Sequence, residues 1–145
     1  MIDIVEEDAD GWAVAGPDLT GLVERAATAA LGRVTGEVVV LLTDDAGVQD
    51  LNARFRGKDK PTNVLSFPAA EGAGALLGDI ALASGVCRAE AAAQGKSLTD
   101  HLSHLVVHGV LHLLGRDHED NDEAEAMEAE ERSILASLGV ADPYR

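Results

Sequence analysis

Apolar residues along the chain alternate between the spacing of strands and the spacing of helices. Residues 37–42 begin with Glu37 and continue as an unbroken run of valine and leucine. This run predicts a strand buried on both faces. Residues 19–31 carry apolar side chains three and four positions apart, which predicts a helix capped by Asp18. Because the two kinds of segment are interleaved, we expect an α+β fold over residues 1–145: a single compact domain with a mixed β-sheet covered by helices.

The other predicted elements follow from shorter patterns and from turn residues. Pro61 and Pro68 bracket a strand at residues 63–67 and favour an edge position for it, because proline cannot donate to a neighbouring strand. Residues 71–78 are predicted to be a loop. Further strands are expected at residues 2–6 and 79–82, and further helices at 44–53, 84–95, 97–115 and 122–138.

Four of the five histidines lie on one side of the long predicted helix. His101, His104, His108 and His112 are three or four residues apart among leucines and valines, so each imidazole needs a partner. His108 and His112 are one turn apart and can reach one metal ion. His104 and His112 are separated by roughly 12 Å along the axis, so a third ligand must come from elsewhere. His118 can supply it if Gly115 ends the helix.

The pattern His108-x3-His112-x2-Gly115-x2-His118 has the metzincin ligand spacing. Three imidazoles would leave one tetrahedral position for water, as in catalytic zinc sites. The alternative is a set of hydrogen-bonded core histidines. Metzincins also carry a glutamate directly after the first histidine, where this chain has Gly109, and this weakens a peptidase reading.

Neighbouring polar residues leave alternatives open. Asp117 either orients a ligand from outside the metal shell or forms a turn or ion pair. His104 has the same two readings, ligand support or a buried hydrogen bond, and the second is preferred for His101.

A short basic segment stands out from an acidic chain. Four of the eleven basic residues, Arg54, Arg56, Lys58 and Lys60, lie within seven positions, in a segment predicted to be a loop. Clustered cations suit phosphate, and arginine can stabilise charge that develops on it. The other reading is a solvated basic turn.

The composition indicates where the protein is located more than what it does. The net charge is −15, with eight acidic residues within positions 119–131, and Cys87 is the only cysteine. No apolar run approaches the ~20 residues of a membrane span, and the acidic start is unlike a signal peptide. We therefore expect a cytoplasmic protein with no disulfide framework and no membrane partner. The net charge argues against nucleic acid, but it averages an acidic helix with a basic segment.

Two segments together resemble the YbeY family, a bacterial family of metal-dependent endoribonucleases that act in rRNA maturation. They are RGKDKPTNVLSFP at residues 56–68 and HLVVHGVLHLLGRDH at residues 104–118. The resemblance extends to the closing residues and implies one zinc-type ion held by His108, His112 and His118, with Arg56 acting in RNA cleavage. Family members commonly have tyrosine where this chain has Arg116.

The resemblance also implies a substrate and partners. They are single-stranded RNA at the 3′ end of the small-subunit rRNA, and the ribosome or its proteins, with a part in ribosome quality control; DNA is not expected. From the residues themselves, and not from the resemblance, we expect Arg54, Lys58, Lys60 and Arg116 to contact RNA, and His104 and Asp117 are candidates for supporting the ligands. A non-catalytic assembly factor with a structural metal and a zinc peptidase are the alternatives.

Overall fold

A computed structural model describes residues 1–117 and 119–144. Its strands are β1 (Ile2–Glu6), β2 (Glu37–Thr43), β3 (Val64–Pro68) and β4 (Leu76–Ala83). Its helices are α1 (Ala9–Trp12), a 3₁₀ turn at Ala13–Ala15, α2 (Leu19–Leu31), α3 (Asp45–Arg56), α4 (Ser84–Ala93), α5 (Leu98–Leu113) and α6 (Asn121–Ser137). Among the described residues, no helix is both long and apolar enough to cross a membrane.

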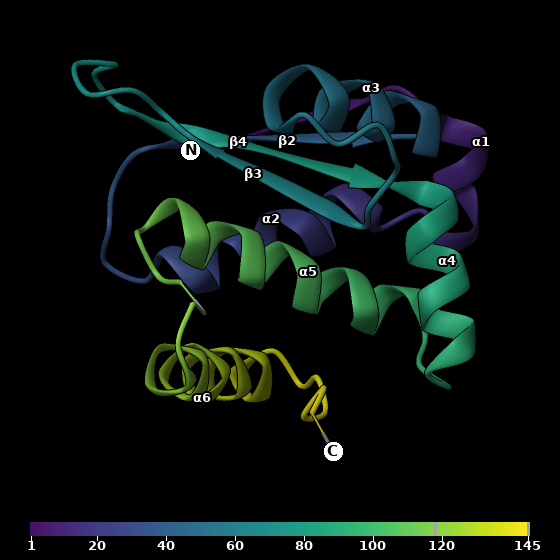
Figure 1. The fold of residues 1–145 in the computed structure, drawn as a ribbon. Coiled ribbons are helices and arrows are strands. Elements are labelled where there is room, and N and C mark those ends of the chain that lie inside the picture. The colour runs from purple at the N-terminus through teal and green to yellow at the C-terminus, as the bar shows by residue number, and fades with distance from the viewer. Residues whose placement is uncertain (118, 145) are drawn as a thin grey trace.

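The four strands form one mixed sheet in the order β1-β2-β4-β3. β1 and β4 both run parallel to β2, whereas β3 runs antiparallel to β4. β3 is therefore an edge strand, as its flanking prolines predicted, and it packs beside α5 (Figure 1).

Helices cover the two faces of the sheet unequally. α2 and α5 pack beneath one face and enclose the main apolar core, which includes Trp12, Val40, Ile80 and Leu111 (Figure 1). α3 lies on the opposite face over a smaller cluster around Val48. α6 packs on α5 from the side away from the sheet. α5 is thus a central helix, with the sheet on one side and α6 on the other.

Several predicted boundaries need correction. The basic segment is not wholly a loop, because α3 continues to Arg56 and ends at Gly57 with a left-handed φ of 68°. β4 begins at Leu76, inside the predicted 71–78 loop, because Leu76 pairs with Glu37 of β2 and Gly78 pairs with Pro68 of β3. The face of β2 toward α3 is only partly buried. α1 was not predicted, since four residues including a glycine carry no helical period.

The histidine helix begins and ends as its sequence predicts. The Ser97 hydroxyl accepts a hydrogen bond from the Asp100 amide at 3.1 Å and caps the start of α5. At the other end Gly115 has φ of 92°, which reverses the chain at a conformation that residues with a Cβ rarely adopt. α5 therefore ends at Leu113, one residue after His112.

Candidate metal centre

His108 and His112 meet at the C-terminal end of α5. Their Nε2 atoms are 3.1 Å apart, and both side chains line one pocket of about 460 Å³. Two nitrogens bound to one tetrahedral zinc ion at 2.0–2.1 Å would lie roughly 3.3 Å apart. The separation and the chemistry of the two imidazoles therefore fit a shared metal ion.

The predicted third ligand, His118, lies outside the described residues. Within residues 1–117 and 119–144, no set of three His, Cys, Asp or Glu side chains is arranged to hold an ion. The described part thus supplies a two-histidine half-site, and the three-histidine ligand set stays a prediction.

Glu131 of α6 holds the other ring nitrogen of His108. Its Oε1 lies 3.2 Å from His108 Nδ1, and its side chain is 1% exposed. An ionised carboxylate only accepts hydrogen bonds, so His108 donates from Nδ1–H. In the neutral imidazole this leaves the lone pair on Nε2, which is the atom that faces His112.

The ionised form of Glu131 is favoured in spite of burial. Burial acts to raise the pKa of the carboxyl group, but hydrogen bonds from His104 and His108 and the electrostatic attraction of those rings outweigh it and lower the pKa to about 2. Burial, followed by the charge of Glu131, raises the pKa of the Tyr144 hydroxyl. Glu131 is therefore an acceptor shared by three side chains.

His104 and His101 bind carboxylates. His104 Nε2 lies 2.9 Å from Glu131 Oε1, and His101 Nε2 lies 2.9 Å from Glu90 Oε1. The His101 side chain is 4% exposed and matches the predicted hydrogen-bonded core residue. Along α5, His104 lies between His101, which is bound to Glu90, and the His108–His112 pair. Its ring centroid is 6.3 Å from that of His108.

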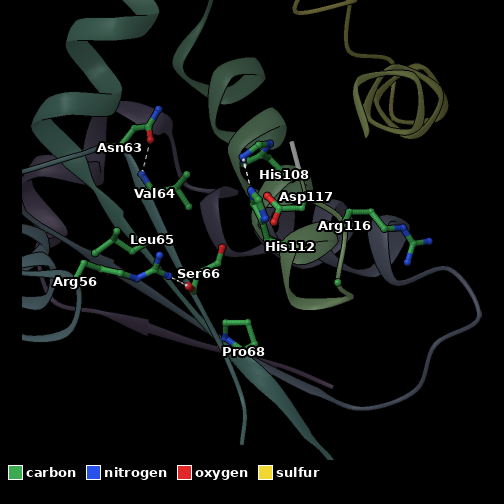
Figure 2. A pocket seen from close by; sticks show the side chains of 11 residues that line it. Arg56, Asn63, Val64, Leu65, Ser66, Pro68, His108, His112, Arg116 and Asp117 are labelled. Atoms are coloured by element: carbon green, nitrogen blue, oxygen red, sulfur yellow. Dashed lines mark hydrogen bonds between the residues drawn. The ribbon is translucent and has the colours of Figure 1, made fainter. Parts of the chain in front are cut away.

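Arg56 forms the wall opposite the histidine pair. It is the last residue of α3, its Nη2 donates to the Ser66 carbonyl of β3, and its guanidinium lies 5.3 Å from the centroid of Phe67. Figure 2 shows Arg56 and Ser66 on one side of the pocket, with His108 and His112 on the other. A guanidinium carries five N–H donors, so capacity for a phosphate remains after donation to Ser66.

The other predicted RNA contacts occupy two environments. Lys58 and Lys60 line a groove of about 410 Å³ that also includes Arg56, so these three cations lie together. Arg54 pairs instead with Asp50 at 2.7 Å. Arg116 lines the histidine pocket, but its guanidinium points away from the histidines and pairs with Glu130 at 2.9 Å (Figure 2).

Asp117 is part of the same pocket, with its carboxyl group beside His112 in Figure 2. This position agrees with either predicted reading, ligand support or a polar turn, so its role stays a prediction.

Gly109 packs where a peptidase would carry its catalytic glutamate. A Cβ at this position would lie 3.0 Å from Ile80 Cδ1 and 3.3 Å from Ser66 Oγ. Position 109 therefore faces the sheet at close range, with little room for a longer side chain.

Glu131 was not identified from the sequence, because it is one of eight acids in thirteen residues. A signal was nevertheless present. Glu131 lies four residues after Met127 and four before Leu135, and these three are the buried residues of α6. An acidic residue in line with two core positions indicates a buried carboxylate that needs partners.

Comparison with known proteins places these residues in context. The family model described as "Endoribonuclease YbeY" matches residues 14–139. The protein named Endoribonuclease YbeY in Maricaulis maris is 55% identical in an alignment of 148 positions that covers 99% of this chain and 91% of that protein. The protein of the same name in Paramagnetospirillum magneticum is 52% identical in an alignment of 153 positions that covers 97% of this chain and 93% of that protein.

A solved structure is also similar. The solution structure of TM1509 from Thermotoga maritima matches with a TM-score of 0.58 and 26% sequence identity, over 96% of this chain and 92% of that one. These likenesses extend over nearly the whole chain, so they include both walls of the pocket.

Proposed function

The chain belongs to the YbeY family of endoribonucleases, and we propose that it cleaves single-stranded RNA with a metal ion held by His108, His112 and His118. The observation that carries the proposal is the 3.1 Å approach of two imidazole nitrogens directly across one pocket from an arginine. Zinc is the ion we expect, one per chain, since three neutral imidazoles suit it.

The metal would supply a Lewis acid and an activated water at neutral pH. The work of the chain itself is to position the RNA. Arg56, held by Ser66 and Phe67, binds the phosphoryl oxygens and stabilises the charge that develops on them during cleavage.

The two pockets suggest a path for the strand. The groove with Lys58 and Lys60 and the pocket with the histidine pair share Arg56, Val64 and Leu65. A backbone that follows β3 would pass from the two lysines, past Arg56, to the histidines. A pathway between an edge strand and a helix suits a single strand better than a duplex.

The packing of Gly109 favours this reaction over peptide hydrolysis. A zinc peptidase needs a general base next to its first histidine, and the space beside Gly109 is filled by Ile80 and Ser66. Phosphoryl transfer depends more on positioning and charge stabilisation, which Arg56 can provide.

We further propose the 3′ end of the small-subunit rRNA as substrate, in ribosome maturation and quality control, with action in the cytoplasm. The net charge of −15 supports the ribosome or its proteins as partners, because a chain with few cations would depend on them to deliver the strand.

The direct test is incubation of Zn²⁺-loaded protein with an rRNA precursor that retains its 3′ extension. We expect cleavage by the wild type and none by His112→Ala purified in parallel, which controls for contaminating ribonuclease. Equal cleavage by both proteins, or RNA binding without cleavage across several divalent metals, would contradict the proposal. The second outcome would favour a non-catalytic assembly factor.

A further inference from the structure

We propose that Glu131 is a positioning residue that fixes His108 in its metal-binding tautomer, and that the hydroxyl of Tyr144 holds Glu131 in place. This inference rests on the proposed metal site, but it concerns residues outside the predicted ligand set.

The position of Glu131 calls for an explanation, because a fully buried charge is costly unless it is hydrogen-bonded. Its side chain is 1% exposed, although it lies on a helix rich in exposed acids. Three donors surround it: His104 Nε2 at 2.9 Å, His108 Nδ1 at 3.2 Å, and the Tyr144 hydroxyl at 2.9 Å from Oε2 and 3.0 Å from Oε1. The buried carboxylate therefore accepts hydrogen bonds at both oxygens, and these three donors come from the histidine helix and from the segment after α6.

The carboxylate gives the two histidines opposite tautomers. His104 donates from Nε2, whereas His108 donates from Nδ1. In the neutral rings, the Nε2 lone pair is consequently kept on His108 and excluded from His104. This difference makes His108 a ligand and His104 a supporting residue, although both are histidines on one face of α5.

Tyr144 is held in place by the segment that follows α6. The Lys96 ammonium donates to the Pro143 carbonyl at 2.9 Å, and Arg132 pairs with Asp142 at 3.4 Å. The Asp142 side chain in turn accepts from the Tyr144 amide at 2.9 Å. These contacts tie the segment to the start of α5 and to α6, and they bring the hydroxyl to the carboxylate.

The test is a Zn²⁺ titration of metal-free protein against a competing chelator. Glu131→Gln keeps the shape of the side chain but removes its charge and replaces one acceptor oxygen with an amide donor. We expect it to weaken Zn²⁺ binding about 10- to 100-fold, the usual effect of changing a carboxylate that supports a metal-bound histidine. Tyr144→Phe should weaken binding by a smaller factor. Glu125→Gln, the same charge change at an exposed position of α6, should leave it unchanged.

A second readout separates positioning from general stability. ¹⁵N NMR of the histidine rings in metal-free protein should find His108 as the Nδ1–H tautomer in the wild type and in Glu125→Gln, and as a mixture in Glu131→Gln. A folded Glu131→Gln protein with wild-type Zn²⁺ affinity and an unchanged His108 tautomer would overturn the inference. If that variant does not fold, unchanged affinity in Tyr144→Phe would overturn the role of the tyrosine. A wild-type chain that binds no Zn²⁺ would instead refute the metal site itself.

Discussion

The two ends of α5 carry the same residue type and use it in different ways. At the N-terminal end, the Nε2 of His101 is bound by Glu90 and that of His104 by Glu131. At the C-terminal end, the Nε2 atoms of His108 and His112 face each other across 3.1 Å. Spacing along the helix is nearly uniform, so the difference comes from the carboxylates that α4 and α6 bring to each ring. Neighbouring acidic residues, rather than the histidine pattern alone, divide this helix into a structural half and a half that we propose binds the metal, called the metal-binding half below.

The largest expected effect comes from removing one histidine from each half. His112→Ala should lower Zn²⁺ affinity by more than the roughly 100-fold upper range of outer-shell changes, because a direct ligand is lost. His101→Ala should retain one Zn²⁺ per chain, but should lower the free energy of unfolding by about 1–3 kcal/mol because Glu90 loses a buried partner.

Elemental analysis and chemical denaturation of both variants measure these two effects. Loss of metal from His101→Ala, with the fold intact, would break the division between the halves.

The second prediction concerns Arg56, which lines the same pocket as His108 and His112 of the metal-binding half. Arg56→Glu should reduce RNA cleavage by about 10²- to 10³-fold, since a cation that stabilises developing charge is replaced by an anion. Zn²⁺ content should stay at the wild-type level, because Arg56 binds Ser66 and not a histidine. Arg25→Glu is the matched control, since Arg25 pairs with Asp18 at the start of α2 and lines neither pocket. An equal loss of cleavage in both variants would deny Arg56 a specific role.

The third prediction tests how tightly the metal-binding half packs on the sheet. Gly109→Leu should lower the free energy of unfolding by about 1–3 kcal/mol, because its Cβ would already touch Ile80 and Ser66 at 3.0–3.3 Å and the larger side chain would overpack this contact. Thermal melting with and without Zn²⁺ measures this effect. Unchanged stability would mean that the site has room for a larger side chain and would weaken the argument against a peptidase.

The smallest effect concerns Cys87 of α4, the helix that supplies Glu90 to the structural half of α5. Burial, followed by the charge of Glu90, raises the pKa of the Cys87 thiol from 9.0 to about 12. A raised pKa stabilises the fold below pH 9, and this contribution is lost as the pH rises from 9 toward 12. The native thiol should therefore react with a disulfide reagent at pH 8 far more slowly than the unfolded chain. Equal rates would show that the Cys87 thiol is accessible to the reagent in the folded protein.

Much of the fold and part of the site followed from the sequence, for identifiable reasons. The bounds of α2 and the cap of α5 were predicted because apolar periodicity and a Ser-x-x-Asp signature act locally. β4 was predicted too short because Leu76 and Leu77 lie in a glycine-rich stretch and join the strand only through pairing with β2 and β3. Glu131 was missed because its role depends on the packing of α6 against α5. Local patterns predict elements, whereas contacts between distant segments decide what the histidines do.

We propose that RNA cleavage requires a metal ion bound at the histidine pair. The most direct measurement follows the cleavage of a single-stranded rRNA 3′-end precursor by one preparation, first after chelation and dialysis and then during titration with Zn²⁺. We expect no cleavage by the metal-free protein and recovery that saturates at one Zn²⁺ per chain. Full-rate cleavage by protein shown by elemental analysis to hold no metal would contradict the account.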